Sequence, residues 1–63
     1  MYEILIHTRE YPKGEVFEGF LDDNRPALFF SKEEALKYAK DMSLAWRFHG
    51  YCTIREVSNN VVM

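Results

Sequence analysis

The residues of this chain that could hold a metal ion are few and poorly spaced. His49 and Cys52 stand three positions apart, which is the spacing of half a zinc site, and the only other histidine is His7. A structural zinc site needs four ligands, and cysteine is among the residue types most often simply buried. We therefore expect no metal, and we interpret His49 as a cation near the negative end of a helix.

Patterns typical of catalysis or cofactor binding are also missing. The acidic run at 22–24 lacks the alternating positions and the distal glutamate of a calcium loop. The glycines, at positions 14, 19 and 50, are too scattered for a phosphate-binding loop. A chain of 63 residues also has little room for a pocket of the usual ~300–1,000 Å³. We expect a protein that is not an enzyme and that uses no cofactor.

The composition is that of a small globular domain. Hydrophobic residues make up 48% of the chain and charged residues 29%, a balance that disfavours disorder. No export signal is visible, and no apolar run approaches the roughly 20 residues of a membrane span. The single cysteine, Cys52, cannot form an internal disulfide, which indicates a reducing compartment. We expect a cytoplasmic protein with no membrane partner.

The elements that would position any functional residue begin with two strands. Polar and apolar residues alternate over 2–8, which places Tyr2, Ile4 and Ile6 on one face of a half-buried strand. Residues 11–14 form a turn that contains Pro and Gly. Residues 15–21 are predicted to be the returning strand, with Gly19 marking a bulge or a close approach by a neighbour. Residues 22–26 form a loop, and 27–30 a short third strand.

The clearest helix signal covers 32–48, a stretch without Gly or Pro. Ser31 is a suitable N-cap, and Glu34 three residues later completes a capping box. Gly50 is a natural residue to end the helix, and the β-rich stretch 51–57 is predicted to be the last strand. A stripe of residues at helical spacing, with its tryptophan largely buried, is expected to face the core: Ala35, Ala39, Met42 and Trp46.

These elements predict an α+β fold in which one helix covers one face of a small antiparallel sheet. A hairpin, and then a helix that crosses back, brings the last strand antiparallel to the first, so the expected strand order is 2-1-4. Residues 1–58 form a single domain and 59–63 a short tail. Ile4, Ile6 and Ile54 face the helix. The opposite face of the sheet has no cover in the monomer, and it carries Leu5, His7, Tyr51, Thr53 and Arg55.

The outer face of the helix is the first candidate for binding a partner. Leu44 and Phe48 lie one turn apart there, nearly opposite the core stripe. They share this region of the helix with Lys40 and Arg47, and exposed apolar groups with a polar rim often mark an interaction site. The alternative is that the helix ends or bends near Trp46, so that Phe48 folds back into the core.

The open sheet face is the second candidate. Tyr51 and His7 could stack on bases there, and Arg55 could contact phosphate, as in single-strand binders. Glu3 shares this face, however, and a net charge of −2 opposes a generic nucleic-acid binder. Nucleic-acid binding is therefore the alternative to protein binding. Either surface could also serve a symmetric homodimer.

One segment gives a resemblance at the level of a class. The run FSKEEALKYAK at 30–40, followed by the strand at 51–57, is similar to small accessory proteins of bacteriophages and prophages, which often place a hairpin before such a helix and close with one strand. The resemblance covers most of the chain and carries over no functional residue. It implies a small non-catalytic protein-binding module that modulates or inhibits a host protein in the bacterial cytoplasm.

Overall fold

The computed structural model describes residues 1–20 and 27–57. The predicted loop at 22–26, the end of the predicted second strand at Leu21 and the tail at 59–63 lie outside the described residues, as does position 58, where the predicted domain ends. The chain forms these helices and strands: β1 (Tyr2–His7), β2 (Glu15–Val16), β3 (Leu28–Phe29), α1 (Lys32–Asp41), α2 (Leu44–Arg47) and β4 (Tyr51–Glu56). The predicted α+β class is confirmed.

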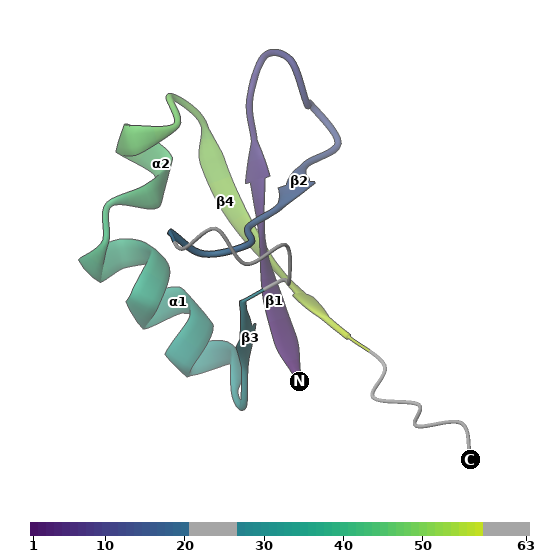
Figure 1. The fold of residues 1–63 in the computed structure, drawn as a ribbon, viewed down its shortest axis with the longest axis vertical. Coiled ribbons are helices and arrows are strands. Elements are labelled where there is room, and N and C mark those ends of the chain that lie inside the picture. The colour runs from purple at the N-terminus through teal and green to yellow at the C-terminus, as the bar shows by residue number, and fades with distance from the viewer. Residues whose placement is uncertain (21–26, 58–63) are drawn as a thin grey trace.

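β1 is the central strand of a four-stranded antiparallel sheet (Figure 1). β4 pairs with all of it, from Tyr2 opposite Glu56 to His7 opposite Tyr51. Since a strand has two edges and β4 takes one of them, β2 and β3 share the other, β2 opposite Leu5–Ile6 and β3 opposite Tyr2–Glu3. The predicted order 2-1-4 is confirmed, and the third strand lies in line with the second.

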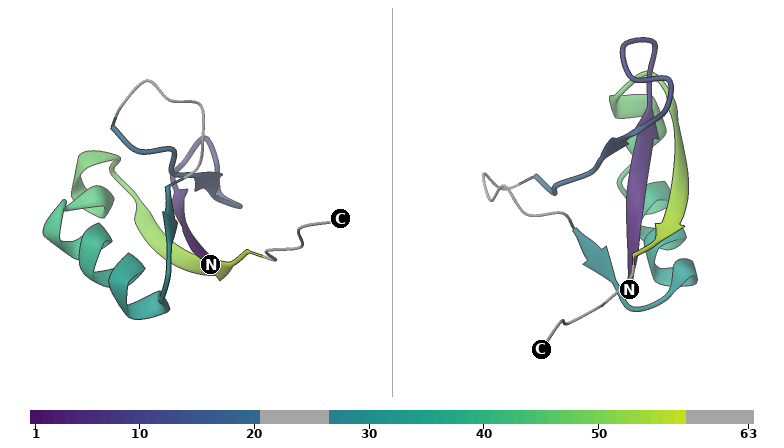
Figure 2. Two further views of the ribbon diagram at one scale, coloured as in Figure 1. Left: turned by 60° about the horizontal axis from the view of Figure 1, so that its bottom comes forward. Right: turned by 90° about the vertical axis from the view of Figure 1, so that its right-hand side faces the viewer.

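Both helices cover the same face of the sheet, as the right-hand view of Figure 2 shows. The core lies between these layers, and its buried residues are Ile4, Ile6, Phe17, Ala35 and Leu44. Ile4 and Ile6 are on the face that the alternation predicts, and Ile54 is half-buried against them. Because burying an Ile, Leu or Phe side chain stabilises by roughly 1.5–3 kcal/mol, this small cluster contributes substantially to stability.

The second strand is shorter than the sequence predicts. β2 covers Glu15–Val16, whereas 15–21 was expected. Gly19 has a φ of 88°, a left-handed conformation that glycine adopts without strain. The chain leaves the sheet after β2 (Figure 1), and the Phe20 ring returns to meet Phe17 edge to face, with ring centroids 5.2 Å apart.

The start of α1 agrees with the predicted cap. The Ser31 hydroxyl accepts a hydrogen bond from the Glu34 backbone N–H at 3.1 Å, and the Glu34 carboxylate accepts one from the Phe30 N–H at 3.2 Å. The carboxylate thus reaches one residue before the N-cap. Both bonds satisfy backbone donors that have no partner inside the helix.

The prediction of one continuous helix over 32–48 is wrong. α1 ends at Asp41, Ser43 has a left-handed φ of 52°, and α2 starts at Leu44. Because of this break, the residues after Ser43 point in other directions than they would in one continuous helix, and two of them lie on the opposite face from the one predicted. Leu44, expected on the outer face, is fully buried (0% exposed), and Trp46, expected in the core, is 79% exposed.

Phe48 lies between its two predicted states. It is 41% exposed, and its ring contacts Phe17 edge to face, with centroids 6.4 Å apart. The alternative of a bend is therefore correct in kind, but the bend comes at Ser43, before Trp46. Beyond Phe48, Gly50 lies against the His7 carbonyl, so close that a Cβ would overlap it. This contact places the start of β4 directly beside the end of β1.

Alanine substitutions at Leu44 and at Trp46 should differ in their effect on stability. Leu44→Ala should lower the free energy of unfolding by about 2–5 kcal/mol, because it empties a fully buried site. Trp46→Ala should cost less than about 1 kcal/mol, as expected for an exposed side chain. Urea denaturation measures both. A Trp46→Ala variant less stable than Leu44→Ala would contradict the observed phase of α2.

The cap at Ser31 gives a second prediction. Ser31→Ala should lower the free energy of unfolding by about 1 kcal/mol, because the Glu34 N–H loses its acceptor. Ser31→Asp is the matched control, since aspartate caps as well as serine does, and it should leave stability nearly unchanged. Equal stability of all three proteins in urea would mean that the cap contributes nothing to this fold.

Candidate protein-binding site

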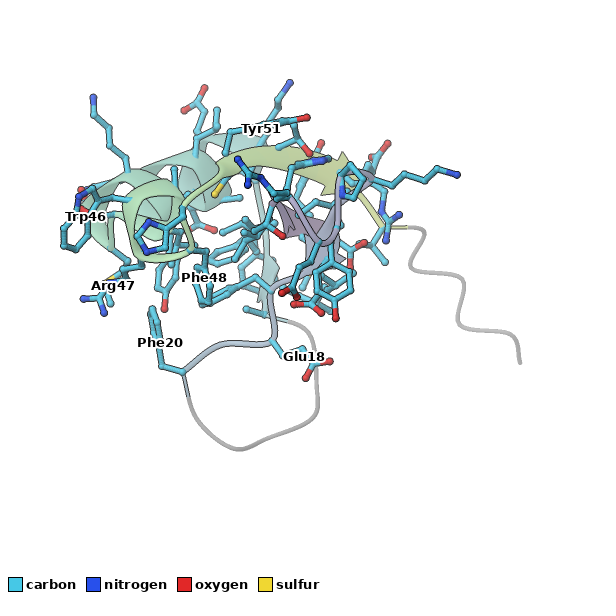
Figure 3. The ribbon with its side chains drawn as sticks, turned by 90° about the horizontal axis from the view of Figure 1, so that it is seen from above. Glu18, Phe20, Trp46, Arg47, Phe48 and Tyr51 are labelled. Atoms are coloured by element: carbon cyan, nitrogen blue, oxygen red, sulfur yellow. The ribbon has the colours of Figure 1, made fainter. Side chains whose placement is uncertain are left out.

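A group of exposed side chains lies on and beside α2. It consists of Trp46 and Arg47 on the helix, Phe48 at its end, and Phe20 beyond β2, and we call it the aromatic patch. Figure 3 shows Trp46, Arg47 and Phe20 along the same side of the molecule. Large apolar groups next to a cation are a composition typical of interaction sites.

Arg47 connects the helix break to this patch. Its Nε donates a hydrogen bond to the Met42 carbonyl at 2.8 Å, at the point where α1 has ended. Its guanidinium carbon lies 5.2 Å from the centre of the Phe20 ring, which is a cation–π geometry. The break therefore supplies an acceptor that orients Arg47 toward Phe20.

The buried Phe17 side chain packs against two members of the aromatic patch. Its side chain is buried, and its ring meets those of Phe20 and Phe48 edge to face. Its backbone is held on both sides, because the Phe17 N–H donates to the Ile4 carbonyl at 2.9 Å and the Phe17 carbonyl accepts from the Ala27 N–H at 3.0 Å. The exposed rings of Phe20 and Phe48 thus rest on a fixed side chain.

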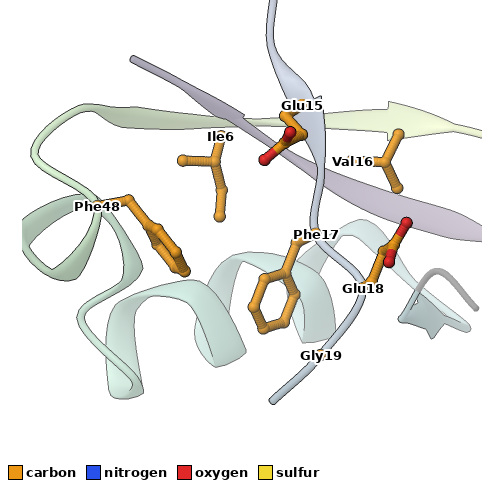
Figure 4. Close-up of a pocket in the computed structure, with 7 residues that line it drawn as sticks. All are labelled: Ile6, Glu15, Val16, Phe17, Glu18, Gly19 and Phe48. Atoms are coloured by element: carbon orange, nitrogen blue, oxygen red, sulfur yellow. The ribbon is translucent and has the colours of Figure 1, made fainter. Parts of the chain in front are cut away.

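A groove of about 270 Å³ runs between Phe48 and the strand region around β2. Ile6, Phe17 and Phe48 turn toward one another in it (Figure 4), and the Glu15 carboxylate stands at its rim, whereas Glu18 points to the other side of the strand. A second hollow of about 360 Å³, with Arg9, Tyr11 and His49 in its lining, adjoins the first at Phe48 and Glu15. Apolar surface with a carboxylate at the rim suits the stem and charged head of a lysine or arginine.

The predicted residues of the open sheet face do lie together. Glu3 is opposite Arg55, Leu5 opposite Thr53, and His7 opposite Tyr51. Glu3 is 5% exposed, and its carboxylate accepts hydrogen bonds from the Arg55 guanidinium, with Nε at 2.6 Å. The positive charge of Arg55 is therefore balanced within the protein.

His7 is held from three sides on the same face. Its ring stacks on that of Tyr51, with centroids 4.5 Å apart and planes within 1°. Nδ1 lies 3.0 Å from the Pro12 carbonyl and Nε2 lies 2.7 Å from the Thr53 hydroxyl. Because a carbonyl only accepts, Nδ1 carries a hydrogen, and in the neutral ring Nε2 accepts from Thr53. Both ring nitrogens are engaged inside the protein.

The candidate residues therefore separate into three groups. Phe48 and Arg47 belong to the aromatic patch, and Lys40 is exposed on α1 outside it. Leu44 is no longer a candidate for binding, because it is buried. The sequence prediction missed Trp46 and Phe20. Gly19 was the one available signal for Phe20, since a glycine that turns the chain also redirects the next side chain.

The predicted absence of a metal stays a prediction. Within residues 1–20 and 27–57, no three His, Cys, Asp or Glu side chains gather in a way that could hold an ion. Burial raises the pKa of the Cys52 thiol above its ordinary value, which disfavours the thiolate that metals bind. None of the helices described here has the length and apolar character needed to cross a membrane.

Comparison with protein-family models, with curated protein sequences and with solved structures finds no match to this chain.

The ion pair on the open face gives a prediction of stability. Arg55→Met should lower the free energy of unfolding by about 1–3 kcal/mol, because the buried Glu3 carboxylate loses its charged donor. Glu3→Gln combined with Arg55→Met should recover part of this loss, since no unpaired charge remains. Urea denaturation of both variants measures the difference. If Arg55→Met alone had no effect, the Glu3 carboxylate would not depend on this partner.

Proposed function

We propose that this chain is a protein-binding module whose contact surface is the aromatic patch. The observation that carries the proposal is Trp46, 79% exposed next to Arg47 on a four-residue helix. Tryptophan and arginine are among the residue types that contribute most to binding energy at protein interfaces. Exposing a large ring to water is unfavourable for the free protein, and a partner that covers it recovers this free energy.

The arrangement of the patch also favours a protein partner. Two of its rings, those of Phe20 and Phe48, pack on the buried Phe17 ring, so they lose little conformational freedom when a partner binds. The adjoining groove, with the Glu15 carboxylate at its rim, suits a basic or long apolar side chain from that partner. By resemblance to phage accessory proteins, we propose that the partner is a bacterial protein whose activity is modulated or inhibited by this contact.

Nucleic-acid binding through the open sheet face is the weaker proposal. Its one favourable feature is the stacked pair of His7 and Tyr51, since an exposed ring can carry a base. Against it, Arg55 is paired with Glu3, and both nitrogens of His7 already have partners. The net charge of −2 supplies no general attraction for phosphate.

The proposal predicts which variant loses its partner. Tagged wild-type protein should capture a defined protein from a bacterial lysate, and Trp46→Ala should weaken this binding about 30-fold or more, as loss of a hot-spot residue does. Phe30→Ala is the matched control, because Phe30 is 82% exposed but lies at the other end of α1. Binding of the purified partner to all three proteins, measured by calorimetry, gives the affinities.

Equal affinity of Trp46→Ala and wild type would reject the aromatic patch as the contact surface. The nucleic-acid alternative has its own result. A labelled single-stranded oligonucleotide would bind in low salt, lose affinity steeply as salt rises, and lose it again in Tyr51→Ala. That pattern, with no effect of Trp46→Ala, would support the sheet face instead.

A further inference from the structure

The outer edge of β4 is a strand edge without a partner among the described residues. β4 pairs with β1 on one side, and both helices lie behind the sheet and leave the other side uncovered (Figure 2). With six residues β4 is as long as β1, and its register is unbroken. It contains no proline, lysine or bulge, features that commonly block pairing at an edge, and of its two charged residues Arg55 is paired with Glu3 and Glu56 ends the strand.

The hydrogen-bonding groups on this edge belong to alternate residues. The Val57 N–H donates to the Met1 carbonyl at 2.8 Å, which marks these two residues as a pair that exchanges hydrogen bonds across β1 and β4. By alternation along an antiparallel pair, the amides of Thr53 and Arg55 also face β1. The amides of Cys52 and Ile54 therefore face outward, where an added strand would meet them.

We propose that a second copy of this chain occupies the free edge of β4. The two β4 strands pair antiparallel, with Thr53 on the two-fold axis, so that Cys52 exchanges hydrogen bonds with Ile54 of the second copy. The two sheets become one continuous sheet, with all helices on the same side. This inference goes beyond the proposed function and does not depend on it, because the aromatic patch lies outside this edge.

The side chains of β4 complement themselves in this register. On the helix side, Cys52 and Ile54 of the second copy form an apolar pair. On the open face, Tyr51 lies opposite Arg55 of the second copy, which stays paired with Glu3 of its own chain, so no unpaired charge is brought to the contact. The two Thr53 hydroxyls meet at the axis.

Neighbouring registers are less favourable. An axis at Ile54 would set the Glu56 carboxylate opposite Cys52, on the apolar side. An axis at Arg55 would set two like charges directly opposite each other, which destabilises a sheet. An axis at Cys52 would run the pairing past the start of β4 at Tyr51. Thr53 is therefore the position that the sequence of the strand selects.

Leu36 adds an apolar contact on the same flank. The Tyr38 ring packs on Phe29 of β3 at 5.2 Å, which identifies the flank of α1 that faces β3. Leu36 lies about 200° around the helix from Tyr38, so it faces the opposite flank, that of the free edge. It is 48% exposed, and a second copy at the edge would approach it.

Amide hydrogen exchange of the unmodified protein tests the pairing. The amides of Cys52 and Ile54 should slow by at least about tenfold between dilute and concentrated protein, because mass action fills the edge. The amides of Thr53 and Arg55 are the internal control, since they bond to β1 in either state and should change little. Rates at Cys52 and Ile54 that do not depend on concentration would overturn the proposal. Slowing that appears only when another protein is added would also overturn it, in favour of a foreign strand.

Disulfide trapping tests the register. In a Cys52→Ser background, Thr53→Cys should form a covalent dimer on mild oxidation, because directly opposite residues of a non-hydrogen-bonded pair have Cα atoms about 4.5 Å apart. Glu15→Cys in the same background is the matched control, exposed on β2 at the other edge of the sheet, and should stay monomeric. Equal cross-linking of the two variants would reject the edge, and a dimer trapped by native Cys52 would reject the axis at Thr53.

Discussion

The left-handed backbone at Ser43 determines which side chains face the core and which face solvent. Such a conformation costs an ordinary residue roughly 1–2 kcal/mol, so other contacts must offset it. Leu44, fully buried directly after the break, and Arg47, which donates to the free Met42 carbonyl, are the contacts that do so. Trp46 is exposed as a consequence. The surface proposed to bind a partner and the packing of the core therefore follow from one turn of the backbone.

The sheet and the start of α1 could be predicted from the sequence because their signals are local. Alternation over β1 defines two faces, and Ser31 with Glu34 defines a helix start, whatever the rest of the chain does. The break at Ser43 has no such signal, since 32–48 contains neither Gly nor Pro. It reflects tertiary packing, in which burying Leu44 outweighs the local preference for a continuous helix. The assumption of one continuous helix over 32–48 therefore placed both Leu44 and Trp46 on the wrong face.

The open face of the sheet is stable without a covering layer because its polar groups are bonded to each other. Glu3 with Arg55, and His7 with Pro12 and Thr53, use their hydrogen-bonding capacity within the face. A face with satisfied polar groups gains little from a new polar partner. The aromatic patch is different, since its exposed surface is mostly carbon and water is a poor partner for it. Covering the aromatic patch would therefore gain more free energy than covering the open sheet face.

The pairing of β1 with β4 also has a consequence for synthesis of the chain. Tyr2 is paired with Glu56, so the central strand receives its longest partner only from the end of the described chain. While the ribosome is still making α1 and α2, their apolar sides have only half a sheet to cover. Contacts between residues far apart in the sequence form slowly, because closing the long loop between them costs entropy before the contacts stabilise it. Until β4 has left the ribosome, β1 can pair with β2 and β3 on one edge only, and its other edge has no partner among the described residues.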